Sequence, residues 1–128
     1  MQYLLDTHVM IWWITSDNRL STKAMDLISS QRNLLYWSVV SSWEIAIKYK
    51  LGRLVFEEPP EKLIPAQLDR NQIDTLPIFN EHAFLAGQLP LHHKDPFDRM
   101  LVAQAKSESL GIISNDPQLP LYDVDVLW

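Results

Sequence analysis

Four acidic residues of this sequence hold positions from which they can act together. Asp6 and Asp116 each follow a short apolar run of the kind that forms a buried strand. Glu44 and Asp98 each lie in the first turn of a segment with helical spacing. Carboxylates that share a crevice repel one another unless a divalent cation lies among them. Mg²⁺ and Mn²⁺ prefer carboxylate and water oxygens, so these residue types predict a metal site.

Taken singly, each of these acids also has a structural explanation. Glu44 lies three residues after Ser41, and Asp98 three residues after Asp95, which is the spacing of a helix-capping box. The two aspartates that follow strands fit the start of a turn. Helix caps and turns do not need to converge, however, so four independent placements at one edge of a sheet favour the metal site.

The apolar pattern that must position these acids alternates between strands and helices. Short apolar runs predict strands over Tyr3–Leu5, Leu34–Trp37, Ile73–Ile78, Ile112–Ser114 and Asp123–Leu127. Helical spacing, caps and prolines predict helices over His8–Ile14, Thr22–Ser30, Ser41 to near Gly52, Glu61–Arg70, Glu81–Gln88 and Pro96–Ser107. This order predicts an α/β sandwich on a parallel sheet. The functional crevice of such a sheet lies beyond the carboxyl ends of its strands, where all four acids are expected.

Helical spacing also predicts which residues enter the core. Trp43, Ile47 and Leu51 share one helix face and are expected to pack inside. The helix over Pro96–Ser107 is apolar almost all round, which predicts a central, buried position. We interpret the Trp12-Trp13 pair as core or as a subunit contact, because it lies in an apolar segment.

The composition narrows the class of protein. The 128 residues carry 16 acids, 11 bases and no cysteine, for a net charge of −5. We expect residues 1–128 to form one domain that acts in the cytoplasm without a membrane segment. The absence of cysteine excludes disulfides, thiol catalysis and cysteine-ligated metals. The net charge argues against a simple basic module that binds nucleic acid.

Four motifs of the chain together resemble those of the PIN-domain nucleases, and among these most closely the VapC-type toxins of type II toxin–antitoxin pairs. The motifs are Asp6-Thr7-His8, Ser42-Trp43-Glu44-Ile45, Asp95-Pro96-Phe97-Asp98-Arg99 and Ser114-Asn115-Asp116. The resemblance covers essentially the whole chain. It implies a PIN-like α/β/α sandwich with a central, mainly parallel sheet.

The resemblance also implies an activity and partners. It makes the acidic quartet, which comprises Asp6, Glu44, Asp98 and Asp116, the catalytic residues and the ligands of Mg²⁺ or Mn²⁺. The hydroxyls of Thr7 and Ser114 would support these acids, and Asp95 would cap a helix. The implied protein is an endoribonuclease that hydrolyses RNA phosphodiester bonds as a toxin. Its implied partners are RNA, a cognate antitoxin that covers the acidic crevice, and a second copy in a homodimer.

Three basic or aromatic residues near the acids are candidate RNA contacts, namely Arg99, Lys48 and His8. Lys48 equally fits an ordinary ion pair with the acid four residues before it on the same helix. The adjacent His92 and His93 are interpreted as loop residues, because their spacing does not suit a zinc site.

Two other classes of protein compete with the nuclease. A receiver domain also binds Mg²⁺ among acids, but its family needs an acidic pair after the first strand and a late lysine. Here Asp6 stands alone, and no lysine follows Lys106. A non-catalytic α/β interaction module, whose acids only cap helices, remains the second alternative. Such a module predicts no stabilisation by Mn²⁺.

Overall fold

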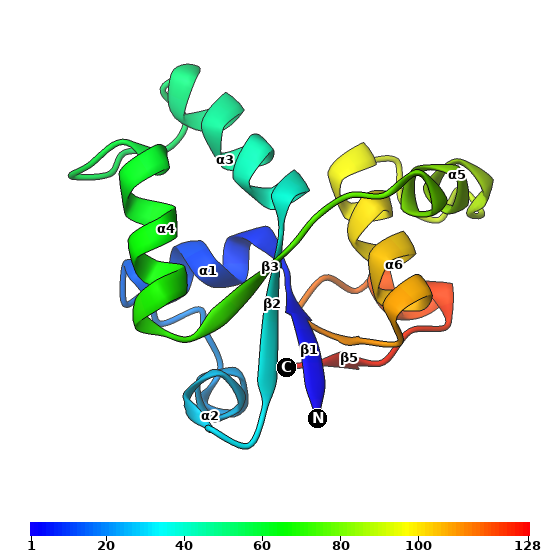
Figure 1. Ribbon diagram of the computed structural model, residues 1–128, viewed down its shortest axis with the longest axis horizontal. Coiled ribbons are helices and arrows are strands. Elements are labelled where there is room, and N and C mark those ends of the chain that lie inside the picture. The colour runs from blue at the N-terminus through cyan, green and yellow to red at the C-terminus, as the bar shows by residue number, and fades with distance from the viewer.

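A computed structural model describes all 128 residues and has a five-stranded sheet between two helical layers (Figure 1). The strands are β1 (Gln2–Leu5), β2 (Leu34–Ser38), β3 (Ile73–Leu76), β4 (Gly111–Ile113) and β5 (Val126–Leu127). The helices are α1 (Thr7–Ile14), α2 (Thr22–Ser29), α3 (Val39–Lys50), α4 (Pro60–Arg70), α5 (Asn80–Gln88) and α6 (Pro96–Glu108), with a 3-10 turn η1 (Leu119–Tyr122). All strand pairs are parallel, in the order β3-β2-β1-β4-β5. The expected α/β/α sandwich with a parallel sheet is confirmed.

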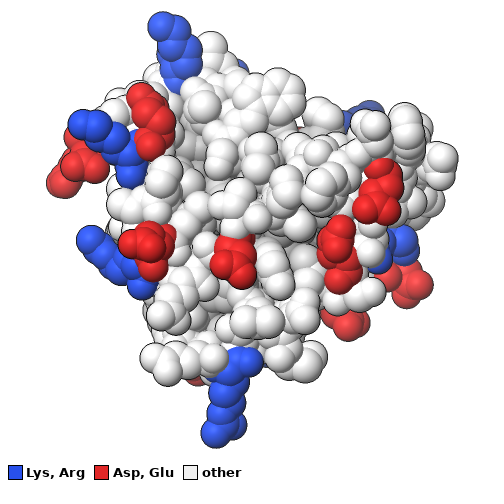
Figure 2. All heavy atoms as spheres, viewed as in Figure 1, with Lys and Arg blue, Asp and Glu red and all other residues white.

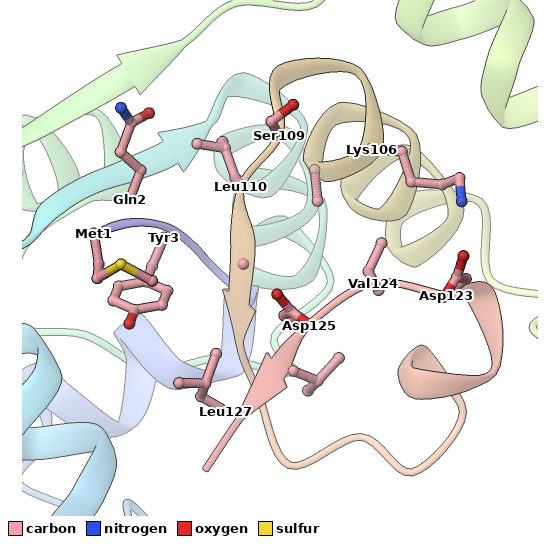
Figure 3. Close-up of a pocket in the computed structure, with 13 residues that line it drawn as sticks. Met1, Gln2, Tyr3, Lys106, Ser109, Leu110, Asp123, Val124, Asp125 and Leu127 are labelled. Carbon is pink, nitrogen blue, oxygen red and sulfur yellow. The ribbon is translucent and has the colours of Figure 1, made fainter.

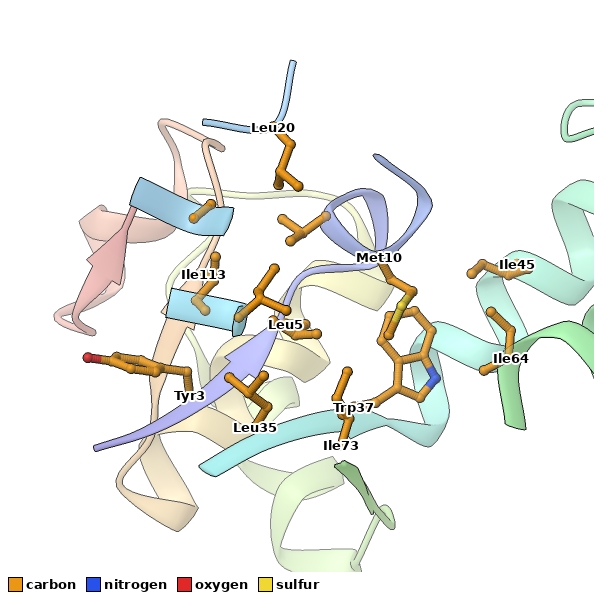
Figure 4. Close-up of a cluster of buried hydrophobic side chains, with 13 residues drawn as sticks. Tyr3, Leu5, Met10, Leu20, Leu35, Trp37, Ile45, Ile64, Ile73 and Ile113 are labelled. Atoms are coloured by element: carbon orange, nitrogen blue, oxygen red, sulfur yellow. The ribbon is translucent and has the colours of Figure 1, made fainter. Parts of the chain in front are cut away.

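Strand β1 lies in the middle of the sheet and is buried on both faces. Its alternate side chains separate the core into two parts, because successive residues of a strand point to opposite faces. Tyr3 and Leu5 enter a cluster with residues of α1, α2, α3 and α4 (Figure 4). Leu4 enters the other cluster, which α6 and η1 cover. In the first cluster the buried Trp37 ring packs near Met10, and its Nε1–H donates to the Ser42 hydroxyl over 2.8 Å.

Helix α6 occupies the central position that its composition predicts. Its residues 101–105 are all buried. The helix begins at Pro96, and the Asp95 carboxylate accepts the backbone N–H groups of Phe97 at 2.8 Å and Asp98 at 3.4 Å. Asp95 is therefore the N-cap of α6.

None of the helices has the length and apolar character that a membrane crossing requires.

The prediction of which face of α3 packs into the core is wrong. Trp43 and Leu51 are each 61% exposed, and the buried residues of this helix include Ser41, Glu44 and Ile45 instead. Trp43 lies against the ring of Phe97 at the surface, with the ring centroids 5.4 Å apart, and the upper end of α3, next to Leu51, projects beyond the sheet (Figure 1). Near the sheet the buried face carries polar residues, and a search for an apolar stripe overlooks such a face.

Two predicted strands are longer than the observed ones. Strand β3 ends at Leu76 rather than Ile78, because Pro77 has no N–H to donate to a neighbouring strand. Strand β5 begins at Val126 rather than Asp123, because Asp123 ends η1 with a left-handed φ of 59°. Both differences shorten an element without changing the topology.

Candidate metal centre

The sheet topology brings the acidic quartet to one edge. Asp6 follows β1, Glu44 lies in the helix after β2, and Asp116 follows β4. Asp98 lies in the first turn of α6, whose amino end reaches the same edge. The pKa of Asp98 is raised to about 8, first by burial and then by the charges of Asp6, Asp95, Glu44 and Asp116, in that order. Four acids from separate elements therefore act on one another through space.

Asp6 is the most enclosed of these acids, at 1% exposure. Its Oδ1 accepts the backbone N–H of Thr7 over 2.7 Å, and its Oδ2 accepts the hydroxyl of Ser114 over 2.6 Å. Burial raises the pKa of Asp6, while His8, Ser114 and Thr7 oppose that rise. Asp6 thus ends a strand, caps α1 and faces the crevice at the same time.

The two expected supporting hydroxyls act on different groups. The Ser114 hydroxyl joins two acids, since it donates to Asp6 and accepts the backbone N–H of Asp116 over 3.0 Å. The Thr7 hydroxyl instead donates to the Ser41 hydroxyl of α3 over 2.8 Å. Thr7 therefore supports Asp6 through its backbone, and its side chain ties α1 to α3.

Glu44 carries the clearest sign of a missing partner. The residue is 6% exposed, and its Oε2 lies 2.6 Å from Lys48 Nζ. Its Oε1 is buried and has no hydrogen-bond partner. An unsatisfied buried carboxylate oxygen is costly, so it needs a cation or a water that the protein itself does not supply.

The capping explanations for Glu44 and Asp98 are excluded by the observed hydrogen bonds. Helix α3 begins at Val39, and Ser38 is its N-cap, which leaves Glu44 in the second turn rather than the first. Asp95 caps α6, and its own N–H donates to His93 rather than to Asp98. Neither acid is needed to satisfy a helix end.

His93 is a member of this site that the sequence prediction missed. Its Nε2 lies 2.9 Å from Asp116 Oδ2 and 3.1 Å from Asp98 Oδ2, and its side chain is 14% exposed. The residue does lie in the loop before α6, as expected, but its ring reaches between two acids of the quartet. Only its closeness in sequence to Asp95 and Asp98 hinted at this role.

The three candidate RNA contacts all have partners within the protein. Lys48 pairs with Glu44, and His8 Nε2 lies 2.8 Å from the Asn115 side-chain oxygen. The Arg99 guanidinium donates to four backbone carbonyls, those of Ala86, Leu89, Pro90 and His93. Contact of these residues with RNA stays a prediction.

A groove of about 400 Å³ adjoins the site and carries the nearest cluster of basic side chains. Glu44 and Phe97 line it together with Lys48, Arg53 and Lys94. Three cations beside an acidic crevice could hold phosphate groups, because phosphate contacts fix the register of a nucleic acid.

A cavity of about 920 Å³ lies elsewhere in the molecule. It is formed at the amino ends of β1 and β4, where the Tyr3 ring, Leu110 and Leu127 face it (Figure 3). The amino and carboxyl ends of parallel strands lie at opposite edges of a sheet, so this cavity is separate from the acidic quartet.

The residues present fit a hard divalent cation. Carboxylate oxygens make up the donor set, one of them is buried without a partner, and the pKa of Asp98 is raised by burial and then by the neighbouring acids. Each of these features is relieved by a bound cation.

Comparison with known proteins places this geometry among related folds. The model of the PIN domain family matches residues 3–126. Ribonuclease VapC16 of Mycobacterium tuberculosis is 37% identical over 60 residues, an alignment that covers 47% of this chain and only 41% of that relative. VapBC2 from Rickettsia felis, bound to a DNA fragment from their promoter, has a similar structure, with a TM-score of 0.72 at 15% identity over 99% of this chain and 98% of that one. VapBC-1 from nontypeable Haemophilus influenzae has a TM-score of 0.65 at 19% identity, over 99% and 97%.

Proposed function

This chain belongs to the PIN domain family, and on that premise we propose that it is a metal-dependent endoribonuclease, the toxin of a toxin–antitoxin pair. The observation that carries the proposal is that the other three acids of the quartet act on Asp98 through their charges, while one buried oxygen of Glu44 has no partner. The partial similarity to a VapC ribonuclease supports the same activity. We further propose that residues 1–128 form one domain and that the protein acts in the cytoplasm.

Within this proposal, each acid of the quartet has a different role at the metal. A bound Mg²⁺ or Mn²⁺ would polarise the phosphoryl oxygen and activate a water. Asp6 and Asp98 would be its direct ligands, while Glu44 and Asp116 would bind through water or orient the attacking water. The free Oε1 of Glu44 suits it to accept a hydrogen bond from that water. Ser114 keeps Asp6 oriented, since its hydroxyl donates to Oδ2.

The RNA strand approaches along the basic groove. Lys48, Arg53 and Lys94 would hold its phosphates beside the quartet, which offsets the overall charge of −5. Arg99 and His8 are further candidate contacts, although each now binds protein groups.

A cognate antitoxin and a second copy of the chain are the proposed protein partners. The antitoxin would cover the acidic crevice and compete with the cation if it places a positive charge there. For the homodimer, a broad uncharged area lies over α3, α6 and the β3–α5 connection (Figure 2). Exposed apolar side chains on α3, this connection and α5 support it: Val39, Trp43, Ile78, Phe79 and Phe84. Uncharged, apolar surface of this kind is typical of subunit contacts.

The activity is tested by mapping RNA ends after brief expression of the intact chain and of Asp98→Asn. We expect new RNA ends only with the intact chain, and cleavage by the purified protein only with Mg²⁺ or Mn²⁺. Identical RNA ends from both chains would refute the assignment. A non-catalytic module would produce no cleavage and would gain no thermal stability from Mn²⁺.

A further inference from the structure

His93 is held in place by the fold before any cation binds. Its backbone N–H donates to the Tyr122 hydroxyl over 2.6 Å, and its carbonyl accepts from Arg99 over 3.3 Å. The same guanidinium also binds the carbonyls of the residues that lead to the loop, at 2.8–2.9 Å for Ala86, Leu89 and Pro90. The position of the imidazole is therefore set by α6 and η1, not by a ligand.

The hydrogen bonds of the ring assign its tautomer. Nδ1 of His93 accepts the backbone N–H of Asp95 over 3.2 Å. A ring nitrogen that accepts carries no proton, so the proton of the neutral ring is on Nε2. This N–H donates to Asp116 Oδ2 over 2.9 Å, and Asp98 Oδ2 lies 3.1 Å from the same nitrogen.

The position of this proton decides between two roles. The groups of His93, Asp98 and Asp116 lie within 4.8 Å of one another, which by itself suits a metal site with one imidazole ligand. A nitrogen that carries a proton has no lone pair for a metal, however. To free Nε2, the proton would have to move to Nδ1, where it would face the N–H of Asp95.

We infer that His93 is a positioning residue of the acidic quartet: its Nε2–H donates to Asp116 Oδ2 and holds that acid beside Asp98, and Nε2 is not itself a metal ligand. Asp116 is then fixed at both oxygens, since its Oδ1 accepts the backbone N–H of Gln118 over 2.9 Å. The arrangement of Asp116 beside Asp98 is therefore in place before a cation arrives. This inference deepens the proposed function and rests on it for the identity of the site.

The tautomer is tested first, by ¹⁵N NMR of the histidine rings in the full chain, without metal and with Mg²⁺. We expect His93 to keep its proton on Nε2 in both states. Transfer of the proton to Nδ1 when Mg²⁺ binds would overturn the inference, because it would show that Nε2 had become a ligand. This measurement needs neither a variant nor activity.

The positioning role is tested by Mn²⁺ affinity, followed by electron paramagnetic resonance. His93→Ala should weaken Mn²⁺ binding roughly ten- to a hundredfold, the usual effect of removing a group that orients a metal ligand. His93→Gln should retain most of the affinity, because its amide N–H can reach the same acids. His92→Ala is the matched control, since His92 is exposed and contacts no acid of the quartet.

The outcomes separate this inference from the proposed function. Unchanged Mn²⁺ affinity in His93→Ala would overturn the positioning role, whether or not the intact chain cleaves RNA. An intact chain that binds Mn²⁺ through a His93-dependent site, yet cleaves no RNA, would support the role and refute the nuclease. Nitrogen coupling from His93 in the Mn²⁺ spectrum, lost in His93→Gln, would make His93 a ligand and overturn the inference.

Discussion

Replacing Asp98 with Asn should stabilise the metal-free protein and at the same time remove its response to metal. Asp98 has a pKa of about 8 in the folded chain against an ordinary value of 3.8, so at neutral pH the native state keeps a proton that the unfolded state releases. The native pKa is raised, so the stability of the metal-free protein falls as pH increases from about 4 to about 8. Asn has nearly the same shape as the protonated carboxyl and cannot ionise.

The expected gain in the free energy of unfolding of Asp98→Asn follows from the pKa shift of Asp98. Between 3.8 and pH 7 there are about three pH units, at about 1.4 kcal/mol each, which sets an upper limit of about 4 kcal/mol. The side chain is 16% exposed and solvent screens part of the effect, so we expect a gain of roughly 2–4 kcal/mol at pH 7 and under about 1 kcal/mol at pH 4.5. For a chain of this length, that gain raises the melting temperature by roughly 10 °C.

The assay is thermal and urea unfolding of both chains in EDTA and in Mg²⁺ or Mn²⁺, at pH 4.5 and pH 7. A cation at a hundred times its dissociation constant stabilises the intact chain by about 2.7 kcal/mol, and Asp98→Asn should lose most of this. Asp26→Asn, at an exposed position on α2, is the control and should change neither the stability in EDTA nor the stabilisation by the cation. A variant less stable than the intact chain in EDTA at pH 7, or equally stabilised at both pH values, would refute the reasoning.

Three further changes test separate parts of the structure. Asp6→Asn should abolish metal-dependent RNA cleavage and leave the circular dichroism spectrum unchanged; retained cleavage would exclude it from the site. Gly111→Ala should destabilise the chain by about 1–3 kcal/mol in urea, because the new Cβ would lie 2.9 Å from the Tyr3 ring. Gly87→Ala, with no atom within 4 Å of the new Cβ, should not destabilise it. Lys48→Met should cost roughly 1–2 kcal/mol in EDTA by leaving its buried glutamate partner unpaired; the loss should shrink in Mn²⁺, and an equal loss in both would contradict the metal site.

The fold was predictable where local signals agreed. Helix α6 combines an aspartate cap, a proline at its first position and apolar residues on every side, and it begins where expected. Helix α3 was predicted less well, because its buried face includes Ser41 and Glu44 while Trp43 is exposed. Periodicity identifies an apolar stripe, but it does not reveal that a buried face serves a polar site.

Only the residues of the site whose positions follow from the sheet topology could be predicted from the sequence. The carboxyl ends of parallel strands meet at one edge, so the placement of Asp6 and Asp116 followed from the order of the elements. His93 could not be assigned in this way, because a loop has no periodicity. Its partners come from α6 and from the segment after β4, and only the folded chain brings those groups to one nitrogen.

The hydrogen bond between Asp6 and Ser114 joins residues 108 positions apart. Strand β1 lies at the centre of the sheet, and one of its two neighbours, β4, is synthesised long after it. A growing chain that stops before β4 has neither Ser114 to orient Asp6 nor Asp116 to complete the quartet. If the protein is the ribonuclease proposed above, the order of its strands protects the ribosome that makes it until β4 has been synthesised.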